Sequence, residues 1–209
     1  MTILDVSIPI HDAMTVYRGN PPVQVRPAMT LARDGVSLSE LCLGSHTGTH
    51  VDAPRHFIRG GAGIDALDLG RFIGPVWVAD LRAVRGGIGA GTLGAAAIPR
   101  RTARVLLRTR NSRLWHPARP FTTEFVYLAA DGADWLLERG VRLVGIDYLS
   151  IEGFHVTGAP THKRLLGAGV PILEGLDLFR ATPGRWQMAA LPLRIEHGDA
   201  GLTRAVLWK

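Results

Sequence analysis

The sequence predicts a mixed α/β domain in which strands outnumber helices. Short apolar segments that alternate with polar or small residues recur along the whole chain, whereas few segments have helical periodicity. No internal repeat and no linker-like composition divides residues 1–209, so we expect one domain. A chain of 209 residues is also long enough to bury a substantial core.

The strands are predicted from their apolar or alternating composition and from the turn residues that bound them. They cover 3–10, 23–31, 36–43, 74–81, 104–109, 141–147, 170–174, 186–195 and 204–208.

Helices and loops fill the intervals between these strands. The best helix is 122–139, capped by Thr122 or Thr123 and ended by Gly140, and with the following strand it predicts half of a β–α–β crossover. We expect shorter helical segments at 161–168, starting from Thr161, within 86–97 and, unless it is irregular, at 64–73. Residues 11–22 and 110–121 have loop composition.

Charge and cysteine content exclude several classes of protein. The net charge of +6 comes almost entirely from arginine, with short clusters at 100–104 and 108–113. Since no aromatic-interleaved basic stripe accompanies them, we expect a solvated face and no nucleic-acid binding. Cys42 is the only cysteine, which excludes an internal disulfide. No apolar run reaches membrane-span length and the N-terminus is unlike a signal peptide, so we expect a cytoplasmic protein without membrane contact.

Residues 46–56 concentrate the metal-binding chemistry of the chain. They hold three of the eight histidines and one aspartate. A turn at Gly48 followed by extended chain places His50 and Asp52 on one face and brings His46 to the same side. Two imidazoles and a carboxylate suit Zn²⁺, with Mn²⁺ or Fe²⁺ as harder alternatives. Because strand 36–43 leads directly into this segment, we expect that strand to hold it rigidly.

His56 follows Pro54 and lies out of register with the three proposed ligands. A histidine beside an activated water is a candidate proton shuttle, and we assign His56 that role. The alternative is a polar loop whose histidines bond to the backbone. A structural zinc site is usually closed and cysteine-rich, whereas this segment has no cysteine and leaves coordination positions open.

Further ligands must come from elsewhere in the chain, and spacing does not identify them. The remaining histidines are His11, His116, His155, His162 and His197. Glu174 ends an apolar run, so it needs an arginine, backbone N–H groups or a metal if it is buried, or else it is an exposed strand end.

The pattern HxGTHxDxPxH resembles the signature of the metal-dependent cyclase family, which includes bacterial kynurenine formamidase and isatin hydrolase. Its fixed positions are present at His46, Gly48, Thr49, His50, Asp52, Pro54 and His56. The resemblance continues over nearly the whole chain. It implies a swivelling β/β/α layered fold, and His162 and Glu174 as a second ligand pair, with Asp52 bridging two ions. It also implies a homo-oligomer, a dimer or larger.

This resemblance implies hydrolysis of an amide-type C–N bond in a small molecule, by metal-activated water, as in an arylformamidase that acts on N-formylkynurenine or a similar aryl formamide. The alternatives are a cyclic amide (isatin-like) hydrolase, another cyclase-family reaction, or a non-catalytic metal-binding protein. We expect one or two divalent ions, zinc first and manganese second.

Substrate choice depends on loops that depart from the family pattern. Arg18 and Asn20 replace a proline and an acid, and 151–154 differs from the form associated with kynurenine formamidases. We expect these loops to line the pocket. Tyr17, Phe57 and Trp115 are candidates to pack an aromatic substrate.

Overall fold

A closed ring of seven strands forms the centre of the computed structural model, which describes residues 2–115 and 120–209. In order around the ring, the strands are β12 (Ala200–Trp208), β11 (Gly184–Pro192), β5 (Ile73–Asp80), β7 (Arg104–Arg108), β9 (Leu143–Ile146), β10 (Ile172–Glu174) and β4 (His50–Asp52). The ring closes because β4 also pairs with β12. β1 (Ile3–Asp5) adds an outer strand beside β12.

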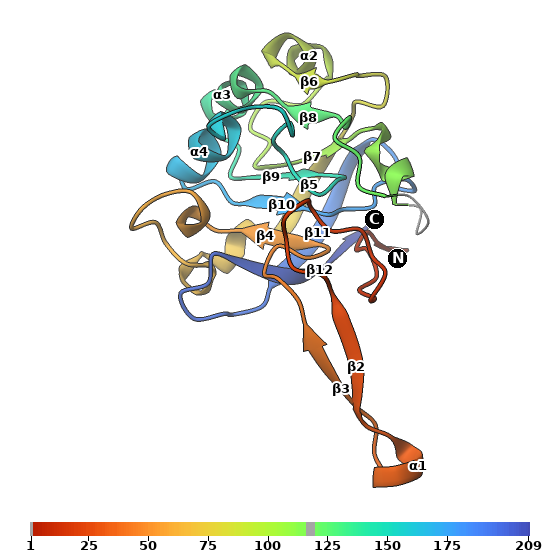
Figure 1. Ribbon diagram of the computed structural model, residues 1–209. Helices are drawn as coiled ribbons and strands as arrows, with labels where there is room; N and C mark the ends of the chain where they lie inside the picture. Colours follow the sequence, from red (N-terminus) through yellow and green to blue (C-terminus); the bar gives the residue numbers. More distant parts are fainter. Residues whose placement is uncertain (1, 116–119) are drawn as a thin grey trace.

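The strands β5, β7, β9 and β10 run parallel, as expected for a chain that crosses over between strands. Helix α3 (Ala130–Glu138) connects β7 to β9, which confirms the predicted crossover. Helices α2 (Ala90–Ala95), α3 and α4 (Pro160–Gly167) gather on one side of the sheet (Figure 1). The mixed, strand-rich α/β class is therefore confirmed.

Two apolar cores lie on either side of the ring wall. One fills the space under the helices and includes Leu136 and Leu165, and the other includes Val51, Phe72 and Leu173. A strand that is buried on both faces needs apolar residues in succession and not in alternation. β7 and β9 are buried along their whole length, which explains their continuous apolar segments.

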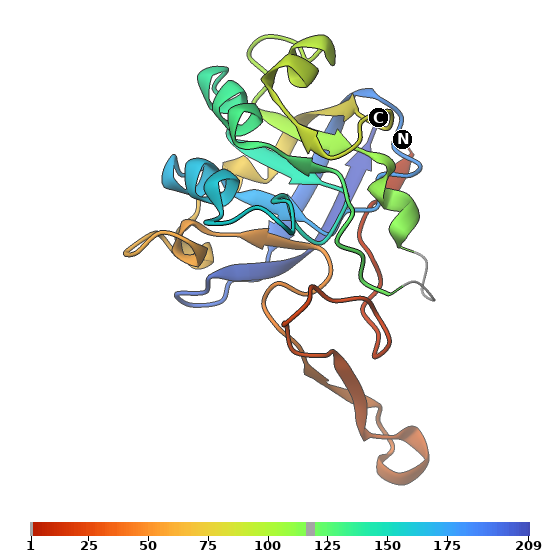
Figure 2. The same cartoon turned by 45° about the horizontal axis from the view of Figure 1, so that its top comes forward.

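A two-stranded arm projects away from this body (Figures 1 and 2). It consists of β2 (Gln24–Met29), β3 (Leu38–Cys42) and the short helix α1 (Leu31–Asp34) at its tip. Every residue of β3 is exposed. The prediction that this strand rigidly holds the histidine segment is therefore wrong, because the segment is anchored in the ring through β4.

Three other predictions fail where tertiary pairing overrides local pattern. The helix expected over 122–139 begins only at Ala130, because the preceding residues are extended and include β8 (Tyr127–Leu128), which pairs with β6 (Gly87–Ile88). The strand expected over 3–10 ends at Asp5, and only Ser7 forms a further isolated bridge. The N-cap of α4 is Ala159, so Thr161 does not cap it.

Short 3₁₀ helices lie in the connections between these elements: η1 (Pro54–His56), η2 (Ile64–Ala66), η3 (Leu69–Arg71) and η4 (Arg110–Leu114). The expected helical segments within 64–73 and 86–97 are confirmed. The predicted loop over 110–121 contains η4, and its His116 lies outside the described residues. Among the described helices, none combines the length and the apolar character that crossing a bilayer requires.

Candidate metal centre

The strands β4 and β10 bring the predicted ligands together. They pair antiparallel, with His50 opposite Glu174 and Asp52 opposite Ile172. His50 and Asp52 are two residues apart on β4, both are buried, and their side chains meet, with His50 Nε2 3.3 Å from Asp52 Oδ1. The predicted shared face is therefore confirmed.

Two glycines allow the backbone to pass closely beside these strands. Gly48 has φ +64°, the left-handed turn that was expected before β4. Gly175 has φ +67°, and a Cβ there would collide with the carbonyl of Gly48. This close approach fixes Glu174 against the turn that carries His46.

Within the described residues the acidic and imidazole side chains form three groups, of which two share Asp52 and the third consists of His46, His56 and Asp199. In the first group, His46 Nδ1 lies 2.9 Å from Asp52 Oδ1, beside His50. In the second, His162 Nε2 lies 3.4 Å from Glu174 Oε1 and 3.7 Å from Asp52 Oδ2. In each group the donor atoms lie within 4.8 Å of one another, close enough to surround one ion.

Among the described residues, the donor atoms at the middle of the cluster have no hydrogen-bond partners. His50 Nε2 and both carboxylate oxygens of Asp52 are buried, yet none of their close contacts has hydrogen-bond geometry. Burying such groups without partners is costly. His50 Nδ1 lies 3.0 Å from the carbonyl oxygen of Gly48, which directs Nε2 toward the cluster, as in histidines that bind metals. These nitrogen and oxygen donors fit a divalent metal.

Glu152 supports the second group, a role that no local sequence pattern indicates. Its Oε2 accepts hydrogen bonds from the backbone N–H groups of Thr161 and His162, at 2.9 and 3.1 Å. The same oxygen lies 3.2 Å from His162 Nδ1. Glu152 therefore caps α4 and orients the imidazole of His162. No local pattern links residues ten positions apart across a loop, so only the fold reveals this contact.

A second missed carboxylate, Asp199, lies on the other side of the centre. Its Oδ2 is 3.1 Å from His46 Nε2, which leaves His46 Nδ1 facing Asp52. Glu174 is fixed in turn by the backbone N–H of Ile151, which donates to its Oε1 at 2.7 Å. These contacts fix His46 and Glu174, whose Nδ1 and Oε2 face Asp52 and His50 respectively.

The carboxylates alter the protonation of the two flanking histidines. Burial alone would lower the pKa of His46, but the Asp52 carboxylate outweighs it and raises that pKa to about 9. Burial likewise opposes protonation of His162, yet Glu152 and Glu174 raise its pKa to about 10. Protons and a metal therefore compete for the same nitrogens.

His56 lies next to the cluster, and its pKa is shifted in the opposite direction from those of His46 and His162. Its ring packs on His46 with centroids 3.9 Å apart, and burial lowers its pKa to about 4. His56 is therefore a neutral imidazole at neutral pH.

A cavity of about 290 Å³ opens beside the cluster. Its lining includes His46, His56, His162 and Glu174 together with the aromatic residues Tyr17, Phe57 and Phe154, and the ring of Phe57 packs on that of His162 with centroids 4.6 Å apart. Asn20 and Glu152 also line it, as expected for loops that depart from the family pattern. Trp115 does not line this cavity and instead donates to the carbonyl of Leu176.

Comparison with known proteins agrees with this geometry. The family model described as putative cyclase matches residues 4–153. The kynurenine formamidase of Salinibacter ruber is 37% identical over 212 residues, covering 99% of this chain and 97% of that protein.

Two solved structures have the same fold. A potential metal-dependent hydrolase with cyclase activity superposes with a TM-score of 0.85 at 36% identity, covering 99% of this chain and 96% of that one. An isatin hydrolase bound to thioisatinate superposes with a TM-score of 0.86 at 22% identity, covering 98% and 91%. With its histidine signature, its closed sheet and this similarity along its whole length, the chain belongs to the cyclase family.

Proposed function

We propose that this chain is a metal-dependent amidohydrolase that cleaves the C–N bond of an aryl formamide. The observation that carries the proposal is the buried, unpartnered donor set of His50 and Asp52 beside an aromatic-lined cavity. Its similarity to kynurenine formamidases along nearly its whole length makes the chain an arylformamidase-like hydrolase. N-formylkynurenine is the substrate that this similarity favours.

We assign the ligands to the two groups that share Asp52. His46, His50 and Asp52 would hold one ion, and Asp52, His162 and Glu174 a second. Zinc suits this set of imidazoles and carboxylates, and manganese is the harder alternative. A bound divalent ion supplies an acidified water and a Lewis acid for the carbonyl.

The remaining chemistry belongs to the side chains around the cavity. His56, neutral and at the cavity wall, accepts the proton of the attacking water and returns it to the leaving nitrogen. Tyr17, Phe57 and Phe154 flank the substrate ring and keep water away from it. Glu152 keeps His162 in place throughout.

Assay of the metal-loaded protein on a small substrate panel tests the proposal. N-formylkynurenine and formanilide should be hydrolysed, with a kcat/KM at least about tenfold above that for isatin, and chelation should abolish turnover. Preferential opening of isatin would instead assign the chain to cyclic amides. Failure to hydrolyse any of these amides in a metal-loaded sample would overturn the proposal.

We further propose that the chain forms a homo-oligomer through its arm. Leu38 and Leu41 of β3 are 52% and 60% exposed, and Leu193, on the body, is 59% exposed. Leu41 and Leu193 also line an apolar groove of about 990 Å³ between the arm and the body. Exposed apolar surface of this extent is typical of an interface, and a second copy offers the same surface.

Light scattering after size-exclusion chromatography tests this assembly. The wild type should elute as a dimer or larger, and Leu41→Asp should shift it to the monomer with its metal content unchanged. A monomeric wild-type protein at micromolar concentration would contradict the proposal.

A further inference from the structure

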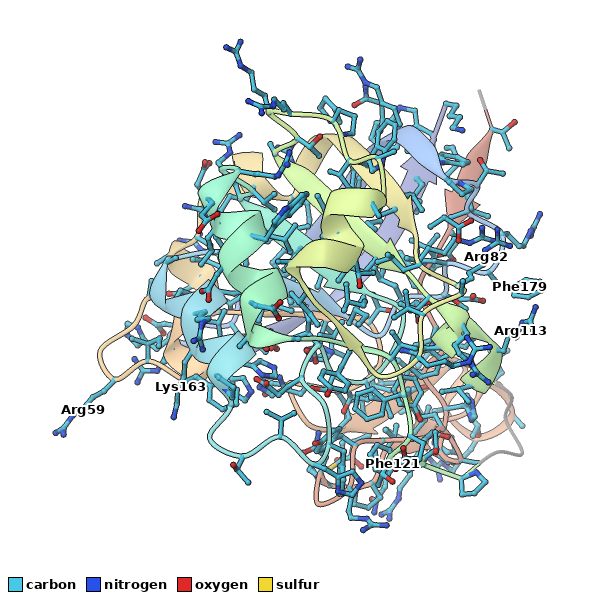
Figure 3. The ribbon with its side chains drawn as sticks, turned by 90° about the horizontal axis from the view of Figure 1, so that it is seen from above. Arg59, Arg82, Arg113, Phe121, Lys163 and Phe179 are labelled. Carbon is cyan, nitrogen blue, oxygen red and sulfur yellow. The ribbon has the colours of Figure 1, made fainter. Side chains whose placement is uncertain are left out.

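Five arginines gather around a cavity that the proposed reaction does not use. The sequence contains the cluster Arg108, Arg110 and Arg113, and the fold brings Arg82 and Arg85 to the same place. With Thr109, Ser112 and Phe179 these side chains line about 210 Å³. Figure 3 shows Arg82, Arg113 and Phe179 at one edge of the molecule, on the opposite side from Arg59 and Lys163.

The cavity lies where two parallel strands end. Asp80 is the last residue of β5 and Arg108 the last of β7, and the two are register partners. Ligands commonly bind outside the carboxyl ends of such strands. None of the residues that line this cavity lines the cavity of the metal centre. The two are therefore separate sites.

Hydrogen bonds to the backbone fix the side chain of Arg108 in the wall of the cavity. It is 9% exposed, and its Nε and Nη2 donate to the carbonyls of Leu178 and Phe179 at 2.9 and 2.7 Å. These acceptors are neutral, and no partner for Nη1 is found within the described ranges. The guanidinium is thus fixed without a direct ion pair, and Asp80 and Asp147 attract it only from beyond contact distance.

The acidic groups nearby do not neutralise the arginines. Asp80 pairs with Arg82 at 2.6 Å. Asp147, behind the cavity, accepts four hydrogen bonds from Thr109 and Ser112.

Four of the five arginines, Arg85, Arg108, Arg110 and Arg113, form no ion pair with any residue in 2–115 or 120–209. The cavity therefore carries an excess of positive charge in a concave space.

We propose that this cavity binds the phosphate group of a small phosphate monoester that carries a planar ring. Guanidinium groups pair with phosphate oxygens through two parallel hydrogen bonds, so Arg108, Arg110 and Arg113 can surround a dianion. Phe179 is 57% exposed at the rim and offers its face to a ring attached to that phosphate. The small enclosed volume suits a single phosphate group rather than a nucleic-acid backbone.

Calorimetric titration of the metal-loaded protein at low salt tests the proposal, with AMP as the probe. AMP should bind saturably with one site per chain, inorganic phosphate should compete with it, and adenosine should not bind. Binding of adenosine as tight as that of AMP would overturn the proposal, and so would absence of saturable AMP binding.

Variants decide where AMP binds. Arg110→Ala/Arg113→Ala removes two exposed side chains that form no ion pair within the described residues, and it should weaken AMP binding at least about tenfold. Phe179→Ala should weaken AMP but not inorganic phosphate. The matched control Arg59→Ala/Arg100→Ala removes the same charge from exposed positions outside the cavity and should bind like the wild type.

Two results would overturn this assignment. Unchanged AMP binding in Arg110→Ala/Arg113→Ala would place the phosphate elsewhere, for example at the metal centre. An equal loss in the control variant would show that AMP responds only to the net charge of the protein.

Discussion

The arm and the metal centre are neighbours in sequence, yet they have opposite environments. β3 ends at Cys42 with all of its residues exposed, whereas β4 begins at His50 with all of its residues buried. Both segments are short and extended. The difference arises because β4 pairs on both edges, with β10 and β12, while β3 pairs, among the described strands, with β2 alone. Long-range pairing, not local pattern, determines which segment can hold buried donor atoms.

The largest effect is expected when a carboxylate is replaced by an amide in the buried segment and, as a control, in the exposed one. Asp52→Asn should abolish metal binding and lower kcat/KM at least about 1,000-fold, because both ligand groups depend on that carboxylate. Glu40→Gln, on the exposed arm, should leave metal content and rate unchanged. Mass spectrometry for metal and an aryl formamide assay measure both. Full activity in Asp52→Asn would contradict the assigned ligands.

A second comparison separates metal binding from proton transfer. His56→Ala should keep its metal but lose about 100-fold in kcat, because the cavity loses its neutral imidazole. His155→Ala is the control, since that side chain is 70% exposed, lies beside Phe154 and Glu124, and does not line the cavity of the metal centre. Normal turnover by His56→Ala would remove the proton-shuttle role.

Substitution of Glu152 tests whether this residue, which is not a proposed ligand, positions the proposed ligand His162. Glu152→Gln should weaken metal affinity by about 10–100-fold, because His162 loses the carboxylate that orients its ring. Competition with a coloured chelator measures the affinity. Glu124→Gln, at an 84% exposed position, should show no change. If both variants bound metal equally well, Glu152 would serve only to cap α4.

The pH dependence of the metal-free protein should give the smallest effect. Protonated His46 and His162 stabilise the fold, since their pKa values rise from 6.5 to about 9 and 10. That stabilisation is complete below pH 6.5 and is lost as the pH rises through 9 and 10. The Tm of the metal-free protein should therefore fall over this range, and added zinc should restore it. A Tm that rises with pH there would contradict the charge assignment.

The strand-rich class and the convergence of the imidazoles and acids could be predicted from the sequence. The residues that hold those imidazoles in place could not. His50 and Asp52 follow from strand periodicity, and the turn follows from Gly48. Glu152 and Asp199 could not be predicted, because each meets its histidine through chain closure rather than through spacing. The exposure of the arm could not be predicted either. The alternating pattern of β3 suggested one buried face, but all residues of β3 are exposed.

The most direct test is the metal content of the purified wild-type chain, measured by mass spectrometry together with its loss on chelation. The account predicts one or two equivalents of a divalent transition metal per chain, with aryl formamide turnover lost and regained with the metal. A chain that contains no metal, takes none up from zinc or manganese solutions, and still hydrolyses the substrate would contradict it.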